Sequence, residues 1–361
     1  MAKIAYSCCG EGQGHSSRTY TIVRALQERG HEVLVFASGK AFEVLSPKLS
    51  KVLRIPGLKL IYEKNKVVVH KSIFANINIL LARKPAIAEI TRNLQTFKPD
   101  LAITDFDPYL PWAAKKLGVP FISIDHQHVL PCVDPMVPLN LRLDWIATKK
   151  IVTSMHSGEM ANLATSFYFP ERLSGHGNTE FFPPILRDEV LKRQSVNEGH
   201  VLVYQTSPSF QRLPQILKQM PFEFRIYAFE REGRDGNLLY HPRSTTTFLD
   251  DLATADWVLT NGGYTCISES LFYRKPVFAV PVERQLEQWV NAYYLEKLGY
   301  GMTCSTHELS TDRLKQFIER KESIRKTLQN GSFCGNEAMI DKVTSFLPNA
   351  KEAAILPASL R

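Results

Sequence analysis

Short apolar runs alternate along the chain with longer segments in which apolar positions recur every three or four residues. The first run covers residues 3–7, and a glycine-rich stretch, a helical pattern over 16–29 and a second apolar run over 31–37 follow it. Short apolar runs bounded by turn residues predict buried strands. A strand, loop, helix and strand in this order favour a parallel sheet covered by helices.

The same alternation continues to residue 124 and begins again near residue 200. Further predicted strands are 59–62, 101–104, 121–124, 200–204, 224–228, 257–260 and 277–280, and further predicted helices are 39–45, 73–97, 111–117, 213–219, 249–253 and 265–272. Residues 169–186, between the two series, are rich in Pro and Gly without sustained periodicity, which predicts a linker.

We therefore expect an α/β protein of two Rossmann-like, doubly wound parallel-sheet domains. The N-terminal domain would cover 1–168, the linker 169–186, the C-terminal domain 187–347 and a tail 348–361. The carboxyl ends of both sheets would face one central cleft, which is where ligands bind in open α/β folds.

Composition narrows the class of protein. The chain has 361 residues, of which 44% are hydrophobic and 22% charged, as in ordinary folded domains. The longest apolar patch, 77–82, is far shorter than the roughly 18 residues that span a bilayer, and the amino terminus lacks the apolar core of a secretory signal. These features predict a cytoplasmic protein. The six cysteines include no C-x-x-C pair, which disfavours a zinc ribbon.

The net charge of +8 arises in the first half of the chain. Residues 51–98 hold ten Lys or Arg against Glu63 and Glu89, and they include the apolar run 73–81. A surface that is both basic and apolar favours contact with an anionic membrane or an acidic substrate, although a solvated basic face is the simpler alternative. No nucleic-acid-binding motif accompanies it, so we expect no nucleic-acid partner.

The glycine-rich loop after the first strand contains Gly10, Gly12 and Gly14, whose backbone N–H groups could meet an anion at the start of a helix. Its G-x-G-x-G spacing differs from the dinucleotide fingerprint, and the second strand ends without an acidic residue. The loop therefore gives little support to NAD binding.

His15, at the first turn of the following helix, is a candidate general base, because a neutral imidazole facing a cleft can accept a proton. Asp105 follows the strand 101–104 and could orient that imidazole, with Asp107 as a competitor for the role. Asp125 and His126 end the next strand on the same rim. No metal site is expected.

The densest signal lies between residues 260 and 301. Gly262 and Gly263 would let the backbone approach a ligand, and the helix beginning near Thr265 would offer N–H groups to a diphosphate. Glu269, one turn on, could accept hydrogen bonds from two ribose hydroxyls. Glu287 and Gln288 would lie at the cleft edge. Together these residues predict a nucleotide-sugar site.

The blocks G-G-Y-T-C-I-S-E-S-L, K-P-V, Q-L-E-Q-W-V-N-A and L-G-Y-G resemble the donor signature of GT-B glycosyltransferases. The resemblance is nearest to the MurG-like branch of family 28 and to relatives labelled teichoic-acid biosynthesis proteins. G-E-G-Q-G-H-S-S-R resembles the amino-terminal loop of that group, and D-H-Q-H-V-L its acceptor-side strand end. The similarity covers most of residues 1–301.

The resemblance implies roles for individual residues. It implies that His15 is the base supported by Asp105, and that Glu269 binds ribose, while Phe248 lies beside the uracil and Ser207 belongs to a phosphate-side loop. Tyr264, Thr265 and Cys266 would meet the phosphates, and Glu287 and Gln288 the donor sugar. The acceptor side would comprise Gly12, Gly14, Arg18, Asp125 and His126. Asn261 stands where some relatives have a histidine.

These implications predict an inverting, metal-independent glycosyltransferase that has no resident cofactor and uses a UDP-sugar as co-substrate. The acceptor would be a hydroxyl, on a lipid-linked or anionic cell-envelope molecule, and the enzyme would contact the inner face of the membrane peripherally. Two alternatives remain open at this stage: a UDP-sugar 2-epimerase of the same fold, and a non-catalytic protein that binds nucleotide sugars.

Overall fold

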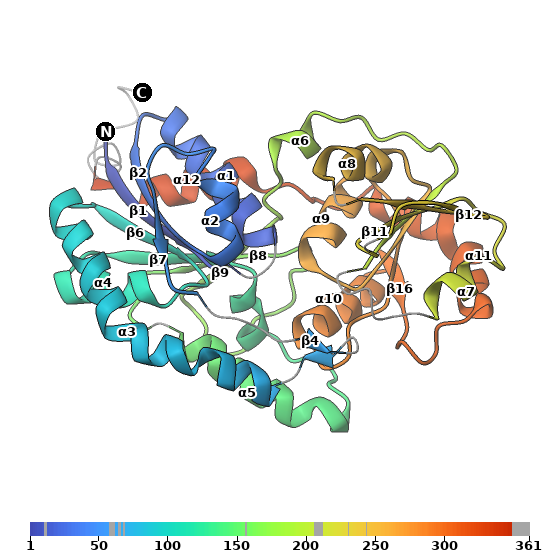
Figure 1. Cartoon of the computed structure of the whole chain (residues 1–361), viewed down its shortest axis with the longest axis horizontal. Helices are drawn as coiled ribbons and strands as arrows, with labels where there is room; N and C mark the ends of the chain where they lie inside the picture. Colours follow the sequence, from blue (N-terminus) through green and yellow to red (C-terminus); the bar gives the residue numbers. More distant parts are fainter. Residues whose placement is uncertain are drawn as a thin grey trace.

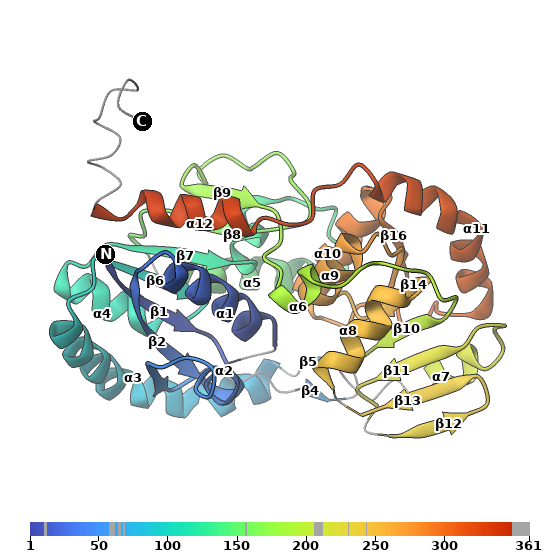
Figure 2. The same ribbon diagram turned by 90° about the horizontal axis from the view of Figure 1, so that it is seen from above.

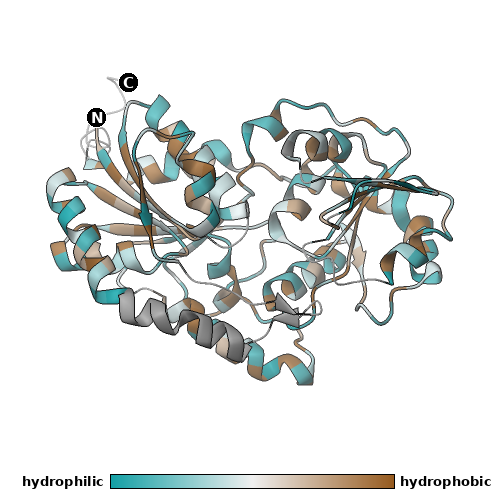
Figure 3. Cartoon of the chain, viewed as in Figure 1, coloured by the Kyte–Doolittle hydropathy of each residue, from teal (hydrophilic) through white to brown (hydrophobic). Residues whose placement is uncertain are grey.

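The computed structural model describes residues 1–10, 13–57, 62–63, 66–67, 69–155, 157–205, 212–229, 231–242 and 244–348. Two α/β domains lie side by side, each built on a seven-stranded sheet (Figure 1). Apolar strands run through the middle of each domain, and hydrophilic positions line the outer helices (Figure 3). Two GT-B-like Rossmann domains are therefore present, as the sequence predicts.

The first sheet has the order β3-β2-β1-β6-β7-β8-β9, and every neighbouring pair is parallel. Its strands are β1 (Lys3–Cys8), β2 (Glu32–Ser38), β3 (Val52–Ile55), β6 (Leu101–Asp105), β7 (Phe121–Asp125), β8 (Asn162–Thr165) and β9 (Thr179–Phe182). The helical segments of this half are α1 (Gln13–Glu28), α2 (Gly39–Leu45), α3 (Val69–Phe97), α4 (Tyr109–Leu117), η1 (Gln127–Cys132), η2 (Leu139–Leu141) and α5 (Arg142–Ser154), and β4 (Tyr62–Glu63) pairs with β5 (Lys66–Val67).

The second sheet has the order β12-β13-β11-β10-β14-β15-β16 and is parallel except for the antiparallel pair β12–β13. Its strands are β10 (Val201–Tyr204), β11 (Phe224–Tyr227), β12 (Gly233–Asp235), β13 (Leu238–His241), β14 (Trp257–Thr260), β15 (Val277–Ala279) and β16 (Gly301–Thr303). The helices that follow the first domain are α6 (Asp188–Leu191), α7 (Leu213–Leu217), α8 (Thr245–Thr254), α9 (Tyr264–Phe272), α10 (Leu286–Lys297), α11 (Thr311–Leu328) and α12 (Asn336–Ser345).

The domain boundaries differ from those that the sequence predicts. Strand β9 falls inside the predicted linker 169–186 but completes the first sheet beside β8. Helix α12 falls inside the predicted C-terminal domain 187–347, yet it returns to the first domain (Figure 2). Its buried Met339, Ile340 and Val343 join the core of that domain, because their spacing gives the helix one apolar face that α1 covers.

Element prediction succeeded where apolar runs were continuous and failed where strands were short or partly exposed. The structure has strand β3 at Val52–Ile55, whereas the predicted strand 59–62 lies mostly outside the described residues. The hairpin β12–β13 was missed because β12 is exposed and reads as a polar turn. Within the part of the chain that the structure describes, no helix is long and apolar enough to cross a membrane.

Candidate active site

The carboxyl ends of the two sheets meet at the interface between the domains. Strands β1, β6 and β7 bring α1, Asp105 and η1 to this interface, while β14 and β15 bring α9 and α10 from the other side. Parallel strands explain this convergence, because all of their carboxyl ends point the same way. The residues that the sequence singled out are therefore collected from widely separated segments.

His15 and Asp105 are in direct contact. Nδ1 of His15 lies 2.7 Å from Oδ1 of Asp105, and the imidazole is 11% exposed whereas the carboxylate is fully buried. A proton on Nδ1 satisfies this contact and leaves Nε2 with a free lone pair. The structure thus brings together the two residues that the sequence paired, and their contact could orient the imidazole.

Arg18 is also part of this cluster and does not face an acceptor. Its Nε donates to Oδ2 of Asp105 at 3.0 Å and its Nη2 donates to Oδ1 at 2.6 Å, which is a bidentate contact. Burial alone would lower the pKa of the Arg18 guanidinium, but the charge and hydrogen bonds of Asp105 more than offset this and raise it. Arg18 lies in the predicted acceptor-side segment, but its guanidinium is directed at Asp105.

Phe106 directly follows Asp105 and adopts a φ of 54°, which is uncommon for a residue with a side chain. Its ring stacks on the imidazole of His15, with centroids 6.4 Å apart. Backbone strain of this kind concentrates at functional sites. Sequence reasoning missed Phe106, because no local pattern marks such a backbone conformation.

Asp107, the alternative partner for His15, has a different role. Its Oδ2 accepts a hydrogen bond from the backbone N of Leu110 at 3.1 Å, in the first turn of α4. Burial raises the pKa of the Asp107 carboxyl to about 6. The structure therefore pairs His15 with Asp105 and assigns Asp107 to helix capping.

Helices α1 and α9 approach each other closely across the domain interface. A Cβ atom on Gly14 would lie only 2.4 Å from Oγ1 of Thr265. The close approach of the two helices therefore requires a residue without a side chain at position 14. Gly12 and Ser207, two other residues of the predicted site, lie outside the described residues.

His126 joins the domains. Its Nδ1 lies 2.7 Å from the carbonyl oxygen of Thr165, its Nε2 lies 2.8 Å from Oδ1 of Asn291, and its ring stacks on Tyr264 at 3.8 Å. Burial lowers the pKa of the imidazole. Because His126 is 1% exposed, the expectation that it lines an acceptor rim is corrected: it is an interdomain contact.

Asp125 is likewise committed to the protein interior. Its Oδ2 lies 2.7 Å from Nδ1 of His128 and accepts a hydrogen bond from Ser123, while Oδ1 accepts one from the backbone N of His128. Burial would raise the pKa of Asp125, but the His128 charge holds it well below its usual range. Asp125 is 1% exposed, so its expected place on the acceptor side is also corrected.

On the donor side, α9 begins at the glycine pair that the sequence predicted. Gly262 has a φ of 89°, and a Cβ there would lie 2.9 Å from the backbone oxygen of Gln288. Gly263 is the N-cap of α9 and carries no side chain that could satisfy the first N–H groups of the helix. Thr265 is partly exposed at this helix start. Cys266 is buried, and burial raises the pKa of its thiol to about 12.

Glu269 forms a bidentate ion pair that the sequence did not predict. Nε and Nη2 of Arg187 donate to its two carboxylate oxygens at 2.8 and 3.0 Å, and Glu269 is 2% exposed. Burial raises the pKa of the Glu269 carboxyl and the Arg187 charge opposes that rise. A ribose at Glu269 would thus have to share these oxygens with Arg187, a linker residue that no motif marked.

Glu287 and Gln288, at the start of α10, differ in accessibility. Glu287 is partly exposed and its Oε2 accepts a hydrogen bond across the interface from Gln127 at 3.0 Å. Gln288 is buried, and its Oε1 accepts a hydrogen bond from the backbone N of Val282 at 2.9 Å. Glu287 is therefore the more accessible of the two predicted sugar contacts.

Phe248 is a partly buried aromatic residue on α8. Its ring packs edge-on against Tyr204 and Tyr227, each with centroids 5.3 Å away. Asn261, where some relatives have a histidine, donates to Oε1 of Gln205 at 2.8 Å and to the backbone oxygen of Val280 at 3.1 Å. Asn261 thus ties together the ends of β10, β14 and β15.

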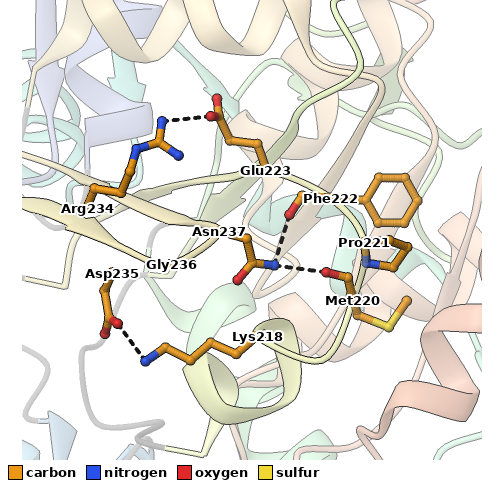
Figure 4. A pocket seen from close by; sticks show the side chains of 9 residues that line it. All are labelled: Lys218, Met220, Pro221, Phe222, Glu223, Arg234, Asp235, Gly236 and Asn237. Carbon is orange, nitrogen blue, oxygen red and sulfur yellow. Dashed lines mark hydrogen bonds and ion pairs between the residues drawn. The ribbon is translucent and has the colours of Figure 1, made fainter.

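A hollow at the far edge of the second domain has a different character. It is lined by Lys218, Met220, Pro221, Phe222, Glu223, Arg234, Asp235, Gly236 and Asn237 (Figure 4). Its charged groups pair with each other, Arg234 with Glu223 and Lys218 with Asp235. We assign it no function.

Over the described ranges, no three His, Cys, Asp or Glu side chains are grouped so that they could hold a metal ion.

Comparison with known proteins agrees with this architecture. The model of the family described as Glycosyl transferase family 1 matches residues 2–321. An uncharacterized glycosyltransferase of Methanosarcina mazei is 24% identical over 84% of the chain and 86% of its own length. The UDP-N-acetylglucosamine–N-acetylmuramyl-(pentapeptide) pyrophosphoryl-undecaprenol N-acetylglucosamine transferase of Thermosipho africanus is 26% identical over 90% and 94%. The crystal structure of Acinetobacter baumannii MurG is similar in fold, with a TM-score of 0.62 and 16% identity over 96% and 100% of the two chains.

Proposed function

Because this chain belongs to the glycosyl transferase family 1, and is thus a glycosyltransferase, we propose that it inverts the anomeric centre of a UDP-sugar as it transfers the sugar to an acceptor hydroxyl. The observation that carries the proposal is the contact of 2.7 Å between His15 and Asp105, located where α1 meets the start of α9. The base and the leaving-group site would then flank a single reacting centre.

In the proposed reaction, Nε2 of His15 takes the proton of the acceptor hydroxyl. The acceptor oxygen forms a bond to the anomeric carbon as the bond from that carbon to the diphosphate oxygen breaks, and UDP leaves with the electron pair. Asp105 accepts the hydrogen bond from Nδ1 and stabilises the imidazolium that forms. A positioned general base of this kind accelerates a reaction about 10²- to 10⁴-fold.

The start of α9 would stabilise the departing diphosphate. The N-terminus of a helix carries a partial positive charge and unpaired N–H groups, both of which favour an anion. Gly263 as N-cap leaves these groups open to a ligand, and Thr265 adds a partly exposed hydroxyl. We propose that this electrostatic stabilisation serves without a metal ion and without a resident cofactor.

The nucleoside and the sugar would lie along α8, α9 and α10. In this proposal Phe248 lies beside the uracil, Glu269 accepts from the ribose while it keeps contact with Arg187, and Glu287 contacts the sugar hydroxyls. The name of the Thermosipho africanus relative includes UDP-N-acetylglucosamine, which supports a UDP-sugar as donor. UDP and related nucleotides can be compared directly.

The acceptor is proposed to be lipid-linked or an anionic cell-envelope molecule, reached from the cytoplasmic face of the membrane. Side chains of the basic stretch that suggested membrane contact are largely undescribed, but α5 supports the idea. Leu143 and Ile146 are 81% and 48% exposed on one face of α5, whereas Trp145 is buried on the opposite face. Exposed Arg142 and Lys150 flank the apolar positions, a combination that suits an anionic bilayer.

Vesicle flotation tests the membrane contact. We expect the wild type to float with anionic vesicles more than with neutral ones, and Leu143→Ser/Ile146→Ser to lose most of that preference. The matched control is Val196→Ser, which removes a 52% exposed apolar side chain from the other domain. Equal flotation of the wild type with both vesicle types would remove membrane contact from the proposal.

Thermal shift with UDP, GDP, TDP, CMP and NAD tests the donor site. A ligand at a hundred times its Kd stabilises the folded state by about 2.7 kcal/mol, which is a visible shift. We expect stabilisation by UDP that weakens in Glu269→Gln, a substitution that keeps the shape of the side chain beside Arg187. A shift only with TDP or GDP would mean that the donor carries that nucleotide in place of UDP. No shift with any of the nucleotides would favour a protein without this donor site.

Product analysis tests the chemistry. Incubation with UDP-sugars and anomeric analysis by NMR should reveal transfer with inversion, and His15→Gln should reduce it about 10²-fold or more. Conversion of a UDP-sugar into its 2-epimer would identify the alternative enzyme of this fold. Binding without any turnover would identify a nucleotide-sugar-binding protein.

A further inference from the structure

Arg18 is almost fully buried beside the predicted base. It is 5% exposed on α1, one turn after His15, and its guanidinium is aimed at the fully buried Asp105. Both oxygens of Asp105 receive N–H groups from Arg18, and Oδ1 is shared with Nδ1 of His15. Nη2 of Arg18 also lies 3.2 Å from Nδ1 of His15, but the contact of Nδ1 with the carboxylate is shorter, at 2.7 Å, and needs the proton on Nδ1 because a carboxylate only accepts. Three charged or titratable side chains thus form one buried cluster.

We infer that Arg18 is a positioning residue for the proposed base, acting through Asp105. It locks the carboxylate so that Oδ1 accepts the Nδ1 proton of His15, and its charge balances that of the carboxylate. His15 is thereby held as the neutral tautomer with Nε2 free. This inference rests on the proposed function for its catalytic consequence and on the described contacts for the positioning itself.

The shape of the Arg18 guanidinium fixes the orientation of the Asp105 carboxylate. Its Nε and Nη2 form a planar fork that matches the two oxygens of a carboxylate. Rotation of the Asp105 carboxylate would break both of these hydrogen bonds and the contact with His15 at once. A lysine would offer one point charge and would leave the carboxylate free to turn.

Several other titratable side chains face the cluster of His15, Arg18 and Asp105. Burial raises the pKa values of Tyr6 and Cys8 on β1 well above their usual range and that of Tyr264 on α9 to about 12, so all three are neutral near pH 7. His126 is turned away from the cluster, toward the carbonyl oxygen of Thr165 and Oδ1 of Asn291. Among the described side chains, Arg18 is thus the cation whose guanidinium contacts both oxygens of Asp105.

The test compares Arg18→Met, Arg18→Lys and the matched control Arg24→Met. Arg24 lies on the same helix but is 48% exposed and pairs with Glu28 at the surface. Each protein is labelled with ¹⁵N histidine, the His15 signals are assigned with His15→Gln, and the tautomer is read from the Nδ1 and Nε2 shifts. Melting temperatures establish that each variant is folded.

We expect one tautomer, protonated on Nδ1, in the wild type and in Arg24→Met, and a mixture in Arg18→Met and Arg18→Lys. With donor and acceptor, kcat of Arg18→Met should fall roughly 10- to 100-fold at similar KM, which is part of the contribution of a general base.

An unchanged His15 tautomer in folded Arg18→Met or Arg18→Lys would overturn the inference. The spectra need no substrate, so this outcome is separable from failure of the proposed function. If the tautomer changes while the protein transfers no sugar, the positioning role stands and the transferase proposal fails. If Arg18→Met is too unstable for NMR, Arg18→Lys alone decides, since it keeps the charge and removes only the fork.

Discussion

Nε2 of His126 lies 2.8 Å from Oδ1 of Asn291, and this contact joins the end of β7 in the first domain to α10 in the second. Tyr168 donates to the same oxygen of Asn291 at 3.3 Å, and its ring stacks on Tyr294 at 4.2 Å. These buried contacts lie between the two domains. The closed arrangement of the domains is therefore held by specific polar and aromatic pairs.

Replacing His126 by Ala should loosen this arrangement. The variant loses contacts to Thr165 and Asn291 and the stacking on Tyr264, so we expect a loss of about 1–3 kcal/mol in the free energy of unfolding. Small-angle X-ray scattering should give a larger radius of gyration. His307→Ala, at an 84% exposed position, is the control, and an unchanged radius for His126→Ala would show that the domains stay closed without this contact.

Gly14→Ala should interfere with the approach of α1 to α9. Its Cβ would meet Oγ1 of Thr265 at 2.4 Å, while Cβ of Thr265 lies farther away at 3.7 Å. Thr265→Ala should therefore make room, and the double variant Gly14→Ala/Thr265→Ala should recover stability relative to Gly14→Ala alone. Thermal unfolding of the wild type, the two single variants and the double variant gives a double-mutant cycle. Simple additivity of the two changes would mean that no clash arises.

How far the sequence predicts the fold depends on the kind of segment. Strand β6 and helix α9 have continuous apolar or periodic patterns, and both were placed within one residue. Strand β9 was not, because its residues are only partly buried and lie among Pro and Gly. Helix α12 could be recognised as a helix only from its own periodicity, and its return to the first domain depends on tertiary packing.

The candidate site also contains some contacts that the sequence predicts and others that it does not. His15 and Asp105 could be paired from the sequence because each follows a predicted strand of the same sheet. Arg187 could not be paired with Glu269, since it lies in a linker whose path only the folded chain defines. Asp125 and His126 were placed at the right sheet edge, but their burial results from the second domain and η1 packing over them.

Gly262→Ala should destabilise the second domain. Gly262 has a φ of 89°, which costs a residue with a side chain about 1–2 kcal/mol. Its Cβ would also press on a backbone oxygen at 2.9 Å, which cannot swing aside as a side chain can. We expect a loss of about 2 kcal/mol or more by chemical denaturation. Gly263→Ala is the control, because no atom lies within 4 Å of its Cβ position and its φ is negative, so similar losses in both would contradict this account.

The buried pair of Asp125 and His128 should make stability depend on pH. Burial would lower the pKa of His128, but the charge and hydrogen bond of Asp125 raise it above its ordinary value. The folded protein then binds more protons than the unfolded chain between about pH 6.5 and the raised pKa, so stability falls as the pH rises through this window. The pair's contribution is fully present below about pH 6.5 as long as Asp125 remains ionised.

His128→Gln removes the titrating group while Asp125 keeps its hydrogen bonds from Ser123 and from the backbone N of residue 128. We expect the melting temperature of the wild type to fall more between pH 6 and pH 8.5 than that of His128→Gln, because only the wild type loses the proton of His128 in this range. Other groups titrate equally in both proteins, so the difference between the two declines isolates His128. Identical declines would mean that the imidazole is not protonated when it faces Asp125, and the contact would then be a neutral hydrogen bond.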